Sequence, residues 1–209
     1  YIQKISNVYQ YSTIYDFYGF PDELYKMTYP AYGDYNLAKE IQGLFAANGI
    51  PSKLDESRGL DHGAWSVLKI MYPDADIPVI ALSVDSKLGL DALYNIGKSL
   101  APLREKGILI IGSGGTVHNL MEVDWDTFGP DKWAVDFDKW IEKRILDWNT
   151  SELFEYRKQA PYARKAVPTA EHFVPLILAM GAGDTTRKPS LLYRNYQFGS
   201  LSLSTWRFD

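Results

Sequence analysis

The chain has 209 residues, of which 46% are hydrophobic and 23% charged, and its formal net charge is −4. These values are typical of one globular domain spanning residues 1–209, and the acidic balance gives no electrostatic footprint for nucleic acid. The absence of cysteine excludes disulfides, thiolate metal sites and cysteine nucleophiles. The longest apolar run, residues 174–180, is too short to cross a bilayer. We therefore expect a cytoplasmic protein that makes no membrane contact.

The first fifty residues predict a strand, a turn and a helix. Residues 1–14 mix β-branched and aromatic side chains, so we expect this segment to end in a strand, and Gly19 and Pro21 then enforce a turn. Hydrophobic residues repeat at helical spacing over 37–45, and Gly49 is placed to end that helix.

The middle of the chain predicts a βαβ unit. Residues 77–82 and 108–111 are continuous apolar runs typical of buried strands. Between them, residues 93–103 place leucine and isoleucine on one helical face, and Gly107 follows. A strand, a helix and a strand at this spacing indicate a parallel pair. We therefore predict the α/β class, with a mixed central sheet flanked by helices.

The last third predicts one amphipathic helix, a second helix and a final strand. The first helix has its apolar face at Phe137, Trp140, Ile141, Ile145 and Trp148. In residues 201–208 the hydrophobic alternation slips by one position, which indicates a strand with a bulge.

The chain contains three histidines, each in a motif typical of a loop. His118 follows the glycine-rich stretch 112–115, directly after a predicted strand. A nucleotide site is disfavoured there, because the dinucleotide fingerprint needs a further glycine where Val117 stands. Ligands of open α/β sheets bind beyond the carboxyl ends of strands, so His118 and the amide of Asn119 are candidate site residues.

The other two histidines stand beside carboxylates. His62 follows Asp61, which could fix the tautomer of the imidazole, although the same motif also suits a turn without chemistry. His172 follows Glu171 and precedes Pro175, which favours a loop that leads into a helix. We expect folding to gather all three imidazoles around one cleft. From the residues alone, a zinc site built on three histidines is neither supported nor excluded.

Seven segments of the chain resemble, in order, those of the class III extradiol ring-cleaving dioxygenases, in the branch similar to DOPA 4,5-dioxygenase. The resemblance covers nearly the whole chain and is highly specific. The segments are residues 14–21, 59–65, 78–83, 100–104, the loop around His118, 171–176 and 201–204.

The resemblance implies a reaction and a role for each histidine. In this family three protein ligands hold a non-haem Fe(II), which zinc can replace, and open coordination positions take a catechol and O₂. His172 matches a metal ligand, and His118 matches the acid–base residue. His62 matches a second pocket histidine beside the bound catechol and oxygen. The implied reactants are a small aromatic diol and O₂, and the substrate would contact His62, His118 and Asn119.

The chain departs from the family pattern at its start. The family's other two metal ligands are histidines near its N-terminus, and neither occurs in these 209 residues. We therefore expect residues 1–209 to be the C-terminal part of the family domain, without its first strand, the next helix and part of the second strand. A single protein ligand would hold iron weakly, so this chain could also be free of metal.

Three hypotheses follow. The first is an extradiol dioxygenase that opens the ring of a catechol-type substrate, as a monomer or a homo-oligomer. The second is an inactive remnant, or a binding module for aromatic ligands, that lacks two metal ligands. The third is a zinc hydrolase built on the three visible histidines, which requires all three to converge on one ion.

Overall fold

The computed structural model describes residues 1–127 and 129–209. The chain divides into two compact units, Tyr1–Val84 and Asp85–Asp209, and each is described by itself. The α/β class is confirmed, and strand pairing is mixed, with one parallel and two antiparallel sheets of two strands each among the described residues. The prediction of a single domain over residues 1–209 stays a prediction.

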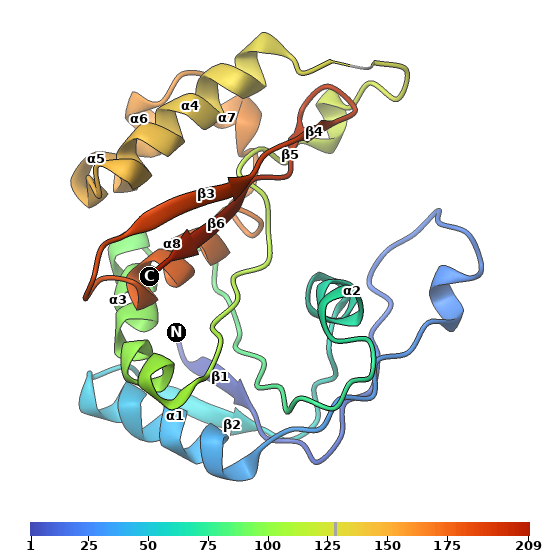
Figure 1. Ribbon diagram of the computed structural model, residues 1–209, viewed down its shortest axis with the longest axis vertical. Helices are drawn as coiled ribbons and strands as arrows, with labels where there is room; N and C mark the ends of the chain where they lie inside the picture. The colour runs from blue at the N-terminus through green and yellow to red at the C-terminus, as the bar shows by residue number, and fades with distance from the viewer. Residues whose placement is uncertain (128) are drawn as a thin grey trace. The chain divides into compact units, whose positions relative to one another are not determined.

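The α-helices and strands of each unit carry their labels in Figure 1. Unit 1 contains β1 (Gln3–Ser6), η1 (Leu24–Lys26), α1 (Tyr35–Ala47), β2 (Ser52–Asp55) and α2 (His62–Met71). Unit 2 contains the helices α3 (Leu90–Ser99), η2 (Ala101–Lys106), η3 (Leu120–Glu122), α4 (Lys132–Leu146), α5 (Thr150–Phe154), α6 (Tyr156–Gln159), α7 (Ala163–Ala166) and α8 (Val174–Ala182). Its strands are β3 (Pro189–Tyr193), β4 (Tyr196–Gln197), β5 (Leu201–Ser202) and β6 (Thr205–Phe208). No helix among the described residues is both long and apolar enough to cross a membrane.

In unit 1, β1 and β2 form a parallel pair, and α1 is the connection that lies beside it (Figure 1). The carboxylate of Asp34 caps α1 by accepting hydrogen bonds from the backbone amides of Asn36 and Leu37. Gly49, with a φ of +69°, follows the helix in the left-handed conformation that favours glycine. The predicted helix is confirmed, whereas the strand expected at the end of residues 1–14 lies near the start of that segment, at Gln3–Ser6.

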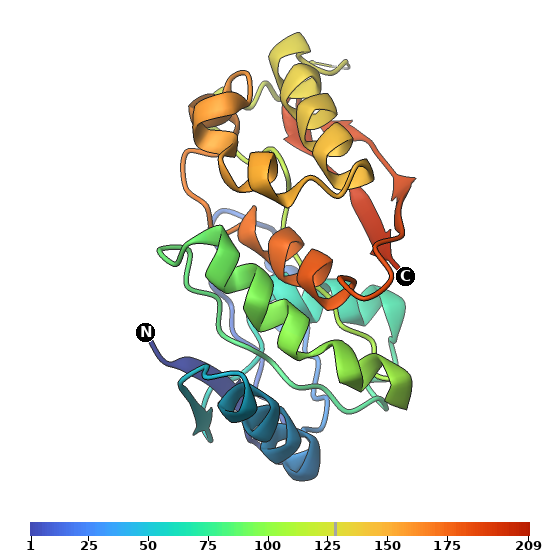
Figure 2. The same cartoon turned by 90° about the vertical axis from the view of Figure 1, so that its left-hand side faces the viewer.

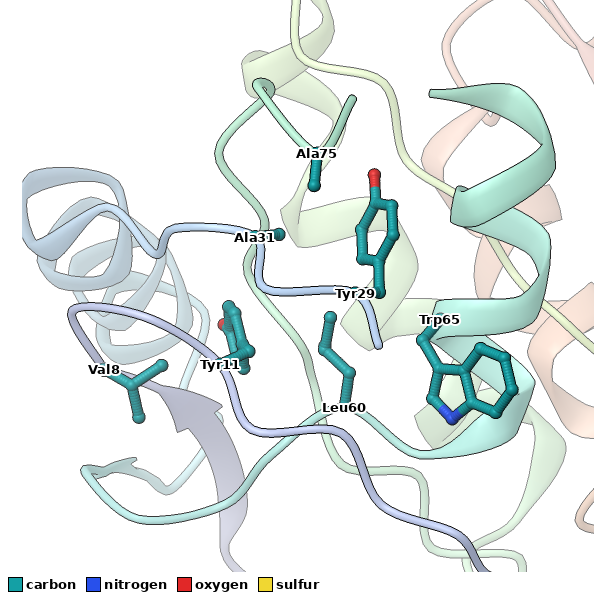
Figure 3. Packing of buried hydrophobic residues seen from close by; sticks show 7 residues of the cluster. All are labelled: Val8, Tyr11, Tyr29, Ala31, Leu60, Trp65 and Ala75. Atoms are coloured by element: carbon teal, nitrogen blue, oxygen red, sulfur yellow. The ribbon is translucent and has the colours of Figure 1, made fainter. Parts of the chain in front are cut away.

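The core of unit 1 surrounds Trp65, whose side chain is 1% exposed (Figure 3). Its indole N–H donates a hydrogen bond of 2.9 Å to the carbonyl oxygen of Ile14, which ties α2 to the N-terminal segment. Burial of an aromatic ring of this size dominates local packing, and its polar N–H needs a partner once it is buried. The buried members of the cluster are Val8, Tyr11, Tyr29, Ala31, Leu60, Trp65 and Ala75.

In unit 2, α3 and α8 run side by side at close range (Figure 2). A Cβ on Gly97 would overlap the carbonyl oxygen of Leu178, and a Cβ on Gly181 would overlap that of Tyr94. The two glycines therefore allow the helix backbones to touch. Leu93 is completely buried on α3, and burial of such a side chain contributes about 1.5–3 kcal/mol.

The two apolar runs predicted to form a parallel pair are not paired strands in the described structure. Residues 77–83 do bond to other segments of unit 1: the Val79 amide donates to the carbonyl of Tyr32, and the Ser83 amide donates to that of Lys4. Only a single antiparallel bridge, Ile5 to Leu82, is formed. For residues 108–111 no strand partner lies among the described residues. The burial predicted for these runs is not observed either, since Ile77, Leu109 and Ile111 are exposed. An apolar run alone specifies neither a partner strand nor the residues that would cover it.

Two predictions for the last third need correction. The buried face of α4 includes Ala134 and Asp138, whereas Trp140 is half-buried beneath the guanidinium of Arg144, 4.0 Å from its ring centroid. The tail is not one bulged strand. Its hydrophobic alternation slips because β5 pairs with β4, whereas β6 pairs with β3, so the chain changes partner between them.

A buried acid stabilises the contact between α3 and the segment that follows α8. Asp184 accepts a hydrogen bond of 2.7 Å from the Tyr94 hydroxyl, and it pairs with Lys98 at 2.8 Å and Arg187 at 2.9 Å. Burial alone raises the pKa of Asp184, but the hydrogen bonds from Lys98 and Tyr94 outweigh it and lower the pKa from 3.8 to about 2.

This lowered pKa predicts a loss of stability in acid. A carboxyl whose folded pKa is depressed contributes stability that is present above its unfolded pKa and is lost as the pH falls towards the folded value. We expect Asp184 to contribute about 2 kcal/mol to the free energy of unfolding near neutral pH, and to lose this contribution between about pH 4 and pH 2. Urea unfolding of the wild type and Asp184→Asn at several pH values measures it. A stability difference between the two that stays constant over this range would contradict the assignment.

Candidate active site

The glycine-rich loop 112–115 lies directly against the backbone that leads into α8. A Cβ on Gly112 would overlap the carbonyl oxygen of Pro175, and a Cβ on Gly114 would overlap that of His172. The amide of Gly115 also donates a hydrogen bond of 2.8 Å to the His172 carbonyl. The glycines therefore serve a close backbone approach, and this contact positions the chain on both sides of the loop.

This contact places His118 against His172. Their ring centroids are 3.8 Å apart and their planes are inclined by 21°, so the two imidazoles stack. The backbone amide of His118 donates to the carbonyl of Ala166 at 3.0 Å, which anchors the end of the loop to α7. His172 precedes α8, which has a proline in its first turn, as predicted. Both rings are half-buried.

A carboxylate adds negative charge beside the two stacked rings. Burial raises the pKa of Glu171, but the hydrogen bond of 2.6 Å from the Thr169 hydroxyl and the nearby His172 and His118 outweigh it, so the pKa lies below its usual value. Glu171 is therefore ionised at neutral pH.

The side chain of Asn119 is engaged within the fold. Its amide nitrogen donates to the carbonyl of Lys165 at 2.8 Å, and its amide oxygen accepts from the backbone N–H of Met121 at 3.0 Å. These bonds cap η3 and hold the loop that follows His118. A role of Asn119 in substrate binding stays a prediction.

His62 lies in unit 1 and begins helix α2, so the prediction that it sits in a loop was wrong. Asp61 has an extended backbone and is the N-cap of α2. Its carbonyl oxygen accepts hydrogen bonds from the backbone amides of Ala64 and Trp65, so the helix begins at His62. The ring nitrogen Nδ1 of His62 lies 2.7 Å from the Asp16 carboxylate, and the His62 amide donates to the same oxygen at 3.1 Å.

Asp16 is a candidate site residue that the sequence analysis missed. Asp61 was expected to orient the imidazole, but its carboxylate pairs with Arg58 at 3.0 Å instead. Burial raises the pKa of Asp16, but the hydrogen bonds from the ring and the amide of His62 outweigh it and lower the pKa. An ionised Asp16 beside Nδ1 favours the tautomer that carries its proton on Nδ1 and leaves Nε2 as an acceptor. The position of Asp16 in the motif 14–21 was the only available signal.

The donor set of the described residues does not by itself form a metal centre. In neither unit do three or more His, Asp or Glu side chains of the described residues gather in a way that could hold an ion. Imidazole binds a metal through a ring nitrogen close to the ring plane, and the planes of His118 and His172 are stacked. In this arrangement one of the two imidazoles can bind a metal ion while the other lies beside it. The two stacked rings are not placed to bind the same ion.

The sequence and the fold match a known family. Residues 2–204 match the family described as the catalytic LigB subunit of aromatic ring-opening dioxygenase. The chain is 43% identical over 199 residues to the 4,5-DOPA dioxygenase extradiol of Portulaca grandiflora, covering 94% of this chain and 73% of the relative. It is 40% identical over 197 residues to the protein of the same name from Escherichia coli (strain K12), covering 91% and 71%.

A solved structure agrees with the sequence comparisons. The crystal structure of uncharacterized protein JW3007 from Escherichia coli K12 aligns with a TM-score of 0.80 and 32% sequence identity, covering 98% of this chain and 80% of that chain. Fold and sequence together define an oxidoreductase of the aromatic ring-opening class. The chain belongs to the LigB family, in the DOPA 4,5-dioxygenase-like branch of the class III extradiol dioxygenases.

The loop contact predicts different effects for neighbouring glycines. Gly114→Ala should lower the free energy of unfolding by about 1–3 kcal/mol, because its Cβ would collide with the His172 carbonyl. Gly115→Ala is the matched control, since its Cβ would come no closer than 3.4 Å to another residue, the carbonyl oxygen of Ser202, and its amide would keep the bond to His172. Urea unfolding of both variants checks the difference. Equal losses would show that the close approach is not what requires glycine.

Proposed function

We propose that the protein catalyses the extradiol opening of a catechol-type aromatic ring by O₂, at a non-haem Fe(II) site that Zn(II) can also occupy. Membership of the LigB family supports the reaction class. The observation that carries the proposal is the stacking of His118 on His172 through a loop whose backbone contacts leave little freedom. The reactants are a small aromatic diol and O₂.

Each histidine has a distinct proposed role. His118 takes a proton from a catechol hydroxyl and later returns it, as a general base and then a general acid. Its half-buried position beside the ionised Glu171 suits a group that must hold a proton transiently. His62, oriented by Asp16, offers Nε2 as a hydrogen-bonding group for the oxygen of the diol or for dioxygen.

His172 is the residue that we propose as a metal ligand. The bound iron would supply the site at which the diol and O₂ meet. Because the described residues do not gather three ligands, they do not fit a closed iron centre, and a complete site needs donors beyond this set.

The incomplete donor set also supports a second candidate, an inactive remnant or a binding module for aromatic ligands. Oxygen consumption by the purified protein, with catechol and Fe(II) supplied, separates the two. Turnover together with a ring-opened product establishes the dioxygenase. Saturable binding of catechol, measured by calorimetry, without O₂ consumption would establish the binding module.

We expect His118→Ala to reduce turnover by about 10²-fold or more, the usual range for a lost acid–base group, without reducing the iron content. Steady-state O₂ consumption and metal analysis of the same preparation measure both quantities. A parallel loss of iron and activity would contradict the acid–base role, because His118 would then act as a ligand.

His172→Ala is the matched counterpart, since the two rings are in contact. We expect this variant to lose both bound iron and activity, because a ligand supplied by the protein is removed. Metal analysis after equilibration with Fe(II) is the measurement. Iron retained at the wild-type stoichiometry would overturn the assignment of His172.

A further inference from the structure

A buried carboxylate lies beside the loop that carries His118. Asp138 on α4 is completely buried, and its side chain accepts hydrogen bonds from several hydroxyl groups. Isolated carboxylates almost never occupy such a position, because the cost of removing the charge from water must be offset by donors. The donors form what we call the Asp138 network: Thr116, Tyr196, Ser202 and Ser204.

The Asp138 network joins three segments that are distant in sequence. Thr116, from the loop before His118, donates to one carboxylate oxygen, and Ser202 on β5 donates to the other. Tyr196 on β4 also donates to that second oxygen, at 2.9 Å, and the Nε atom of Arg194 lies 3.6 Å from it. The carboxylate thus bonds to a different segment through each oxygen.

The network reaches His118 through the two residues before it. The side chain of Thr116 is held by Asp138 and lies 3.0 Å from the Ser202 hydroxyl. The carbonyl of Val117 accepts the backbone amide of Ser202 at 3.1 Å. The backbone amide of His118 is bonded to α7. The peptide between Val117 and His118 is therefore bonded through both its carbonyl and its amide, and Asp138 binds the side chains of Thr116 and Ser202 beside it.

A carboxylate is an unusual side chain at this position of α4. The neighbours of Asp138 on the buried face, such as Phe137 and Ile141, are hydrophobic. A buried charge contributes little net stability, and specifying a geometry is one known use of such a group. Here the geometry that Asp138 specifies is the path of residues 116–118.

We propose that Asp138 is a positioning residue that, through Thr116, holds the imidazole of His118 in its place against His172. This inference rests on the proposed acid–base role of His118 for its effect on catalysis. Its structural part, the placement of the imidazole, does not depend on that role and can be measured without turnover.

The test compares two substitutions at Thr116. Thr116→Val keeps the shape of the side chain and removes the hydroxyl bound to Asp138, whereas Thr116→Ser keeps the hydroxyl and removes a methyl group. Because the chain has three histidines, the Cε1–H resonances of all of them can be assigned by NMR with single histidine variants. We expect Thr116→Val to shift the His118 resonance and leave that of His62 unchanged, and Thr116→Ser to resemble the wild type.

The kinetic arm uses the iron-loaded protein. We expect Thr116→Val to lower kcat roughly tenfold with little change in KM, and to have no further effect in a His118→Ala background.

An unshifted His118 resonance would overturn the inference, and so would an equal fall of kcat in the His118→Ala background. If the wild type lacks ring-opening activity, the proposed function fails and the NMR arm still decides the positioning. If Thr116→Val does not fold, Ser202→Ala, which removes one donor from Asp138, is judged by the same two readouts.

Discussion

The contact between the loop 112–115 and the backbone before α8 is the constraint on which the candidate site depends. Carbonyl oxygens of His172 and Pro175 occupy the space that side chains at Gly114 and Gly112 would need. The energy of such an overlap rises steeply as atoms approach, so larger side chains are excluded at these positions. The hydrogen bond from the Gly115 amide to the His172 carbonyl also fixes the relative orientation of the two segments. Two segments separated by more than fifty residues are thereby held in one register, and stacking of the two imidazoles follows from it.

The site residues are supported by two different electrostatic arrangements. In unit 2 the ionised Glu171 lies beside the stacked pair, and the completely buried Asp138 bonds to Thr116, two residues before His118. In unit 1 the Asp16 carboxylate binds both the ring and the amide of His62, so that a single oxygen fixes the side chain and the start of α2. In unit 1 the carboxylate thus bonds directly to the histidine, whereas in unit 2 Asp138 bonds to Thr116 instead. Hydrogen bonds of this kind are stronger when one partner is charged.

Sequence patterns were most informative where the signal is local. The helix that precedes Gly49 could be predicted because periodicity and a left-handed terminator act within a few residues. The strand predicted at 108–111 failed because its partner is a long-range property. The pairing of His62 with Asp16 could not be foreseen either, because the two residues are 46 positions apart and the adjacent Asp61 was the simpler choice. A charge at Asp138, in the middle of an apolar face, was a local signal that could have been used.

The steric division of the glycine-rich loop bears on how this scaffold could be altered by directed evolution. At Gly112 and Gly114 any side chain meets a carbonyl oxygen, whereas Gly115 has room for a Cβ and the intervening residue, Ser113, already carries a side chain. A mutant library that keeps the two blocked positions and varies the other two would sample new surface chemistry near the imidazole pair while preserving the backbone path. Substitutions that preserve the backbone of this loop are therefore limited to residues 113 and 115.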